Sequence, residues 1–152
     1  MYPPFLFMFY LSIDLETYSI SEITEIMGIA PTEAWMKGDP WGPFKKQLRQ
    51  SSQWTLQLNH QFDADIVEHL SFFVRDFEPY KDKIKLIGKN NNINVHVVVN
   101  HFTESLPPIL LTLEMVHFLS YINAEIDFDM YNCCEYGPVS IPFKPNSTPS
   151  EE

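Results

Sequence analysis

The sequence predicts an α+β domain in which a mostly antiparallel sheet carries its helices on one face. The length of 152 residues fits one domain. Apolar residues make up 45% of the chain, which is enough to build a single core. Stretches with a two-residue apolar period also alternate with stretches of helical period, as mixed folds require.

The opening segment predicts a central strand followed by a helix. Residues 5–14 are apolar on both alternating faces, which is typical of a strand inside a sheet. The run lacks the basic leader of a secretory signal and is shorter than the roughly 20 residues that cross a bilayer. Ser19 and Glu22 have the spacing of a capping box, and Gly28 stands where a left-handed cap belongs. We therefore expect a buried strand and then a helix between Ser19 and Gly28.

The next segment is rich in turn-forming residues. Pro31 prevents the first helix from continuing, and Gly and Pro recur in the following twenty residues. We expect a short strand near residues 34–37 and then an exposed loop. A further strand is predicted over residues 53–59, because apolar and polar side chains alternate there.

The middle of the chain predicts a pair of helices and a strand. Asp65 and Glu68 offer a second capping box ahead of a helical apolar stripe. Pro79 interrupts that stripe but suits the first turn of a new helix. The asparagines at residues 90–92 predict a turn into a strand over residues 93–102.

The last elements complete a recognisable order. Thr112 can cap a helix that Asn123 ends, and residues 124–132 show the clearest apolar–polar alternation of the chain. The order matches a ferredoxin-like βαββαβ core with an added helix and strand. We expect residues 1–136 to form this domain and residues 137–152 to form a Pro/Ser-rich acidic tail.

Charge and cysteine content limit the classes of partner. Twenty acidic against ten basic residues leave a net charge of −10, which repels phosphate backbones and attracts basic proteins. We therefore expect a basic protein partner, no nucleic acid and no membrane, while self-association stays open. Cys133 and Cys134 are adjacent, so they neither staple distant loops nor have zinc spacing. This usage favours the cytoplasm and leaves a redox role open.

One stretch carries a family resemblance. Residues 28–39 read Gly-Ile-Ala-Pro-Thr-Glu-Ala-Trp-Met-Lys-Gly-Asp. They resemble a signature of an uncharacterised bacterial family, domain of unknown function number four-two-seven-nine, and the likeness extends over roughly residues 5–132. The resemblance implies a compact bacterial α+β domain and no particular chemistry. Some small acidic bacterial domains of this sort are similar to immunity proteins that neutralise toxins.

The acidic last strand is the first candidate site. Its outward side chains would form either a docking surface for a basic partner, a divalent-cation site, or a charged edge that only prevents aggregation. Two tryptophans of the turn-rich segment are added as a second group. The candidate partner-binding residues are Glu125, Asp127, Asp129, Tyr131, Trp35 and Trp41.

The turn at residues 35–39 is the alternative site. Trp35, Lys37 and Asp39 supply an aromatic wall, a cation and an acceptor for a small ligand, although these residue types also form turns for backbone reasons alone. The histidines lack the close spacing of a zinc site, so no metal and no cofactor is expected. No nucleophile or phosphate-binding motif is present either.

These observations predict a non-enzymatic bacterial binding protein. Its sharpest form is an immunity protein that neutralises a basic toxin by occluding its surface. The alternative is a small-molecule-binding or hydrolytic domain centred on the turn at residues 35–39. A purely structural, oligomerising domain is a third hypothesis, and a self-complementary apolar patch would be its sign.

Overall fold

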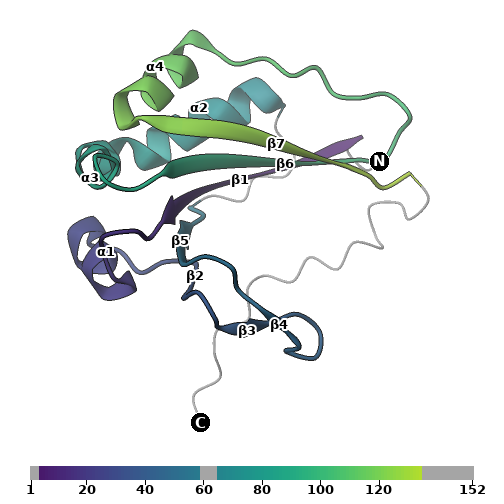
Figure 1. The fold of residues 1–152 in the computed structure, drawn as a ribbon. Helices are drawn as coiled ribbons and strands as arrows, with labels where there is room; N and C mark the ends of the chain where they lie inside the picture. The colour runs from purple at the N-terminus through teal and green to yellow at the C-terminus, as the bar shows by residue number, and fades with distance from the viewer. Residues whose placement is uncertain (1–3, 59–64, 135–152) are drawn as a thin grey trace.

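The computed structural model describes residues 4–58 and 65–134, and its centre is a sheet of five strands. The strand order is β2-β5-β1-β6-β7 (Figure 1), and every neighbouring pair is antiparallel except β6 and β7. The predicted α+β class with a mostly antiparallel sheet is therefore confirmed. The strands are β1 (Phe5–Asp14), β2 (Glu33–Trp35), β5 (Gln53–Leu56), β6 (Ile93–His101) and β7 (Ala124–Asn132).

The helices cover one face of this sheet. Buried side chains of all four α-helices join those of the strands in one hydrophobic cluster. No helix in the described part of the chain is long and apolar enough to cross a membrane. The helices are α1 (Ile20–Met27), α2 (Ile66–Phe77), α3 (Lys81–Ile87) and α4 (Leu113–Ile122), with a 3-10 turn, η1 (Glu78–Tyr80), between α2 and α3.

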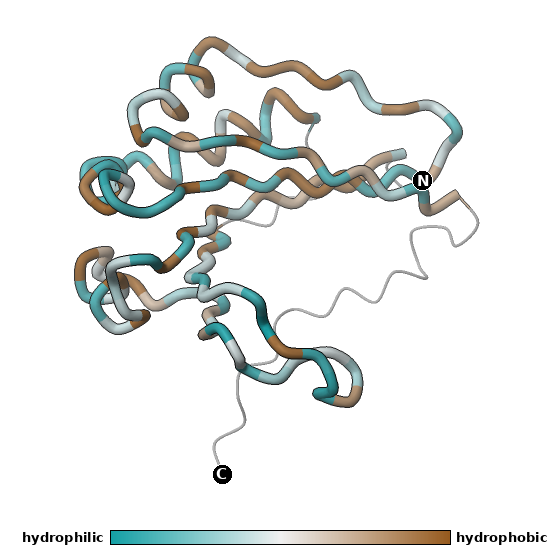
Figure 2. Tube along the Cα trace, in the orientation of Figure 1, coloured by the Kyte–Doolittle hydropathy of each residue, from teal (hydrophilic) through white to brown (hydrophobic). Residues whose placement is uncertain are grey.

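Alternation along the central strands decides which face is buried. Phe7, Phe9 and Leu11 of β1 face the helices, and alternate valines of β6 do the same. In Figure 2 hydrophobic segments recur along these strands, whereas the turn-rich region after β2 is mostly hydrophilic. The sheet thus has one covered face and one face that no helix of the described residues covers.

The connections interleave two βαβ units. Strands β1 and β2 are joined through α1 with β5 lying between them, and β5 and β6 are joined through α2 with β1 between them. Helix α4 then leads to β7, which adds to the edge of β6 in parallel. The ferredoxin-like assignment of β1, β2, β5 and β6 stays a prediction.

The helix boundaries follow the predicted caps. Ser19 and Glu22 form a complete capping box at α1, and Asp65 and Glu68 form the same motif at α2. Asn123 ends α4 with a left-handed φ of 54°. These signals depend on residues three or four apart, so they can be recognised in the sequence before the tertiary fold is known.

Two expectations for the turn-rich segment need correction. The expected exposed loop contains a small hairpin of β3 (Pro40–Trp41) and β4 (Gln47–Leu48). The backbone N–H of Arg49 donates to the carbonyl of Asp39 at 2.9 Å, which closes this hairpin.

Strand β5 also ends earlier than the predicted residue 59. The Thr32 hydroxyl accepts the Gln57 N–H at 2.9 Å, so a side chain replaces the neighbouring strand as the partner at that point. Residue 59 and the predicted tail at residues 137–152 lie outside the described residues.

Candidate functional site

We call the sheet face away from the helices the open face. Side chains of directly paired residues project from the same face of a sheet. One such row runs from Tyr10 through His96 to Asp127, and the next one runs from Met8 to Asp129. Trp35 belongs to the same face, because it pairs with Gln53 and Gln53 pairs with Asp14.

The predicted acidic strand forms the outer edge of this face. Strand β7 is the last strand of the sheet, and Glu125, Asp127 and Asp129 are all exposed on it. Tyr131 follows at the next outward position and is 54% exposed. The structure therefore brings the first four candidate partner-binding residues together on one strip.

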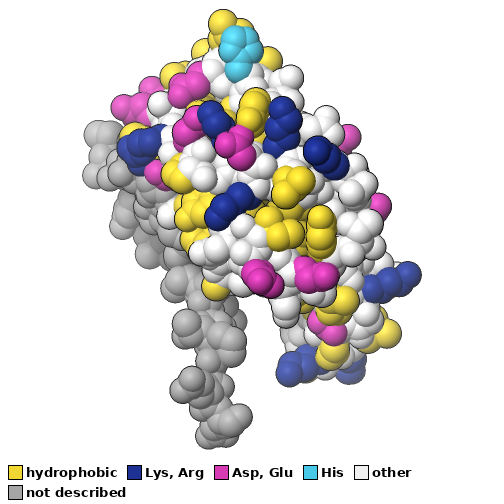
Figure 3. All heavy atoms as spheres, turned by 90° about the vertical axis from the view of Figure 1, so that its left-hand side faces the viewer, with side chains coloured by type: hydrophobic (Ala, Val, Ile, Leu, Met, Phe, Trp, Pro, Cys, Tyr) yellow, Lys and Arg dark blue, Asp and Glu magenta, His cyan; other side chains and the backbone are white. Residues whose placement is uncertain are grey.

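Other parts of the surface carry both signs of charge. Figure 3 views the side of the molecule where α1 and α3 lie, and basic and acidic side chains are interspersed there with hydrophobic ones. Helix α3 alone contributes Lys81, Lys83 and Lys85. The exposed carboxylates of β7 thus form an acidic strip, whereas this side of the molecule carries both signs of charge.

Asp127 makes a contact that the sequence did not indicate. His96 Nδ1 lies 2.8 Å from Asp127 Oδ1, and the other ring nitrogen, Nε2, lies 2.7 Å from Ser12 Oγ. The ring of Tyr10 stacks on His96 at 4.6 Å. This line of side chains ties β1, β6 and β7 together, and it runs from Ser12, which is 0% exposed, to the exposed Asp127.

The protonation of Tyr10 reports the electrostatics of the open face. Burial raises the pKa of Tyr10 above its ordinary value, and the nearby negative charges of Asp129 and Asp127 raise that pKa further. These carboxylates belong to the candidate strip. The strip therefore places negative potential over the middle of the sheet.

We expect Tyr10 to ionise at a higher pH than an ordinary tyrosine. A raised pKa in the folded state means that the folded protein holds its proton longer, so its stability falls as the pH rises above about 10. The absorbance difference between the parent and Tyr10→Phe during an alkaline titration isolates this group. A difference curve centred at or below pH 10 would contradict the expectation.

One group of side chains has the spacing of metal ligands. One ligand atom each from His96, Asp127 and Asp129 lies within 4.8 Å of the others. By distance this set could hold a divalent cation. The contact between His96 and Asp127 accounts for the closeness without an ion, and the sequence did not reveal the group because its members come from two strands.

The rings of the two candidate tryptophans both contact the guanidinium of Arg49. The Arg49 guanidinium carbon lies 3.9 Å from the Trp35 ring centre and 4.8 Å from that of Trp41. The same guanidinium lies 3.5 Å from a carboxylate oxygen of Glu33. Trp41 is 41% exposed at the hairpin, so Trp35 and Trp41 form a group apart from the acidic strip.

In the predicted ligand-binding turn, polar groups of Asp39 and Lys37 form hydrogen bonds within the chain. The Asp39 carboxylate accepts the Met36 N–H at 2.8 Å, and the Lys37 N–H donates to the Ser52 hydroxyl at 2.8 Å. Neither Lys37 nor Asp39 lines the surface hollows that border Trp35. Of the three predicted residues, Trp35 lines these two hollows and Lys37 and Asp39 do not.

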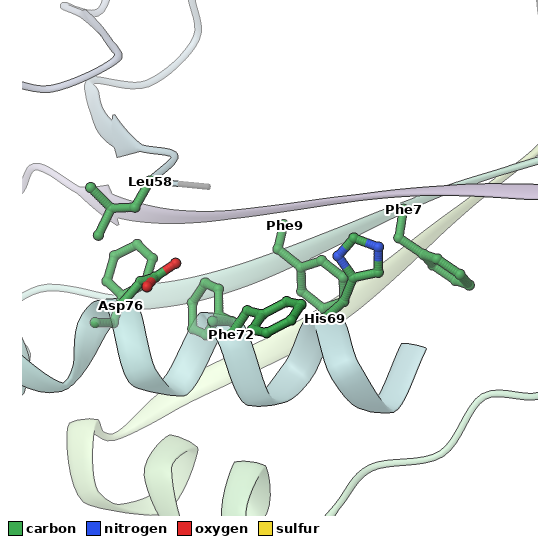
Figure 4. Close-up of a pocket in the computed structure, with 8 residues that line it drawn as sticks. Phe7, Phe9, Leu58, His69, Phe72 and Asp76 are labelled. Carbon is green, nitrogen blue, oxygen red and sulfur yellow. The ribbon is translucent and has the colours of Figure 1, made fainter. Parts of the chain in front are cut away.

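A small interior cavity lies between β1 and α2. Figure 4 shows His69 between the rings of Phe7 and Phe9, with centroid distances of 5.5 Å to each. The cavity measures about 20 Å³, which is room for about one water molecule. It is part of the packed core and too small for a ligand.

Comparison with known proteins places the chain in a family. The family model described as "Domain of unknown function (DUF4279)" matches residues 6–133. No curated protein and no solved structure matches the chain. The matched segment runs from β1 through β7 and so includes the whole sheet. The chain therefore belongs to the DUF4279 family.

Proposed function

We propose that the chain is a non-enzymatic bacterial binding protein whose open face docks a basic protein partner. A cytoplasmic immunity protein that neutralises a basic toxin is the sharpest form of this proposal. The observation that supports it best is the clustering of exposed carboxylates on β7 beside the exposed ring of Tyr131.

The proposed mechanism has two stages. The negative field of Glu125, Asp127 and Asp129 steers a positively charged partner toward the sheet and raises the association rate. Docking then buries Tyr131, because aromatic side chains supply much of the binding energy at protein interfaces. The line from Ser12 to Asp127 keeps the strip rigid, which limits the entropy lost on binding.

The alternative, a small-molecule-binding or hydrolytic domain at the turn, has less support. Asp39 is used by the turn itself, and Lys37 lines neither of the two hollows that border Trp35. Ser12, His96 and Asp127 have the connectivity of a nucleophile, a base and an orienting acid. The Ser12 hydroxyl is closed to solvent, so a substrate has no route to it in this arrangement.

Reversing two charges of the strip should slow the association of the partner. The variant Glu125→Lys with Asp129→Lys leaves the Asp127 contact intact and changes the net charge by about four units at neutral pH. We expect at least a tenfold lower association rate at low salt and a flatter dependence on ionic strength. Stopped-flow or biosensor kinetics with the basic protein isolated from the native host measure both.

A matched control separates this surface from overall charge. Glu25→Lys with Glu114→Lys changes the charge equally, but on helices α1 and α4, which cover the opposite face. This pair should alter the association rate much less. Equal slowing by both pairs, or no slowing by the β7 pair, would remove the support for docking at the strip.

A further inference from the structure

A surface hollow lies on the open face, over the neighbouring strands β1, β5 and β2. Its volume is about 220 Å³, and we call it the open-face hollow. Met8 and Tyr10 line it from β1, and Glu33 and Trp35 line it from β2. Gln53 and Thr55 line it from β5, which lies between those two strands.

Thr55 lines this hollow, and its hydroxyl oxygen is buried beneath the surface. It pairs in register with Glu33 on one side and with Ser12 on the other, so its side chain projects from the open face. The residue is only 8% exposed, and among the described residues its Oγ1 has no hydrogen-bond partner. A buried hydroxyl without a partner costs about 1–3 kcal/mol, so a group bound in the hollow would recover that loss.

The neighbouring threonine shows the contrast. Thr32 also lines the hollow, but its hydroxyl accepts from the Gln57 N–H at 2.9 Å and lies 3.3 Å from the Gln57 carbonyl oxygen. The backbone thus uses one of the two threonine hydroxyls. The Thr55 hydroxyl has no such partner among the described residues, and a rotation about its Cα–Cβ bond would bring it to the surface of the hollow.

The charge of the hollow favours a cation. Glu33 supplies a carboxylate, and no lysine or arginine of the described residues lines the hollow. The amide nitrogen of Gln53 donates to the Asp14 carboxylate at 2.9 Å, which leaves its carbonyl oxygen as an acceptor. Burial raises the pKa of Tyr10, and the nearby negative charges of Asp129, Asp127 and Glu33 raise that pKa further.

Arg49 shows that a guanidinium fits these groups. It stacks on Trp35 and lies within ion-pair distance of Glu33, but it lines a different hollow, together with Trp41. Trp35 lines both hollows and so stands between them. The part of Trp35 that lines the open-face hollow, together with Thr55, is therefore available to a second cation.

We propose that the open-face hollow receives an arginine side chain of the basic partner. Its guanidinium would donate to the Glu33 carboxylate and, once the Thr55 side chain has rotated, to Thr55 Oγ1, since a guanidinium offers several donors in one plane. Its methylene stem would lie against Met8 and the rings of Tyr10 and Trp35. The inference rests on the proposed function for the identity of the partner, but it concerns different residues from those of the β7 strip.

The test uses N-acetyl-arginine amide as the probe, with N-acetyl-citrulline amide as the neutral control of the same shape. In a two-dimensional amide NMR titration, the arginine probe should shift the signals of Thr55 and the Trp35 indole saturably in the millimolar range. The buried indole of Trp54 serves as an internal reference. Absence of saturable shifts, or equal shifts with citrulline, would overturn the inference.

Two variants assign the binding groups. Thr55→Val keeps the shape of the side chain and should weaken the probe about fivefold, and Glu33→Gln should weaken it about tenfold. Thr103→Val, on an exposed loop, is the matched control and should leave the affinity unchanged. If Thr55→Val binds the probe as tightly as the parent does, the hydroxyl has no such role and the proposal fails.

Stability gives a readout that does not depend on the probe. If the Thr55 hydroxyl lacks a partner in the free protein, Thr55→Val should be at least as stable as the parent to urea. A clear loss of stability would show that the hydroxyl is already satisfied and would overturn the inference.

The outcome is also separable from that of the proposed function. Loss of partner binding in the β7 variant, with no effect of Thr55→Val or Glu33→Gln, would reject only the arginine site.

Discussion

Replacing Trp54 by alanine is expected to lower the free energy of unfolding by about 3–5 kcal/mol, the largest single effect predicted for this chain. Trp54 is 0% exposed and lies in β5, the strand between β2 and β1. Removing the indole would leave a cavity that the surrounding strands can close only in part.

A hydrogen bond adds to the packing of this side chain. Trp54 Nε1 donates to the Thr24 hydroxyl at 3.1 Å, and that hydroxyl donates to the Ile20 carbonyl at 2.8 Å. The indole therefore joins the short strand β5 to helix α1. Trp54→Phe keeps most of the buried area but loses this bond, so we expect a smaller loss, with about 1 kcal/mol from the bond itself.

The exposed tryptophan of the hairpin provides the control. Trp41→Ala removes a ring that is 41% exposed and should change the free energy of unfolding by about 0.5 kcal/mol or less. Urea unfolding followed by circular dichroism compares the three variants with the parent protein. A loss in Trp54→Ala no larger than that in Trp41→Ala would contradict the assigned packing.

Local signals explain why the elements could be predicted. The capping boxes at Ser19 and Asp65 each depend on a glutamate three residues later, and both helices begin where these motifs place them. The alternation of β7 likewise predicted that Glu125, Asp127 and Asp129 share one face. Patterns of this kind lie within a few consecutive residues, so they can be interpreted before the fold is known.

Long-range pairing explains what the sequence did not reveal. Ser12 and His96 are 84 positions apart, and their contact depends on β6 being the neighbour of β1. Alternation assigns a side chain to a face, but it does not say which strand lies beside it. The open-face hollow was missed for the same reason, since its residues come from β1, β2 and β5.

The hairpin after β2 shows a further limit. The recurring Gly and Pro of this segment predict turns, and Gly38 and Gly42 both have a positive φ, of 92° and 86°. The Arg49 guanidinium also stacks on Trp35 and Trp41 at this hairpin, and such a contact has no local spacing rule. The segment was therefore expected to be a loop, although its turn residues were recognised.

The second large effect is expected at Asn91, one of three consecutive asparagines. Its side chain is 5% exposed and connects two loops. The Asn91 Oδ1 accepts the N–H groups of Glu16 and Thr17 at 3.0 and 3.2 Å, and its Nδ2 donates to the Ile87 carbonyl at 3.0 Å. Asn91→Ala should therefore lower the free energy of unfolding by about 2–3 kcal/mol, because it leaves these backbone groups without partners.

The flanking asparagines make the comparison decisive. Asn90 and Asn92 are exposed, so their replacement by alanine should change the free energy of unfolding by about 0.5 kcal/mol or less. Asn91→Asp retains the acceptor but loses the donor to Ile87, so its stability should lie below that of the parent as well. If urea unfolding gives the same small loss for all three alanine variants, Asn91 does not connect the loop after β1 to the loop before β6, because that role requires one position to differ from its neighbours.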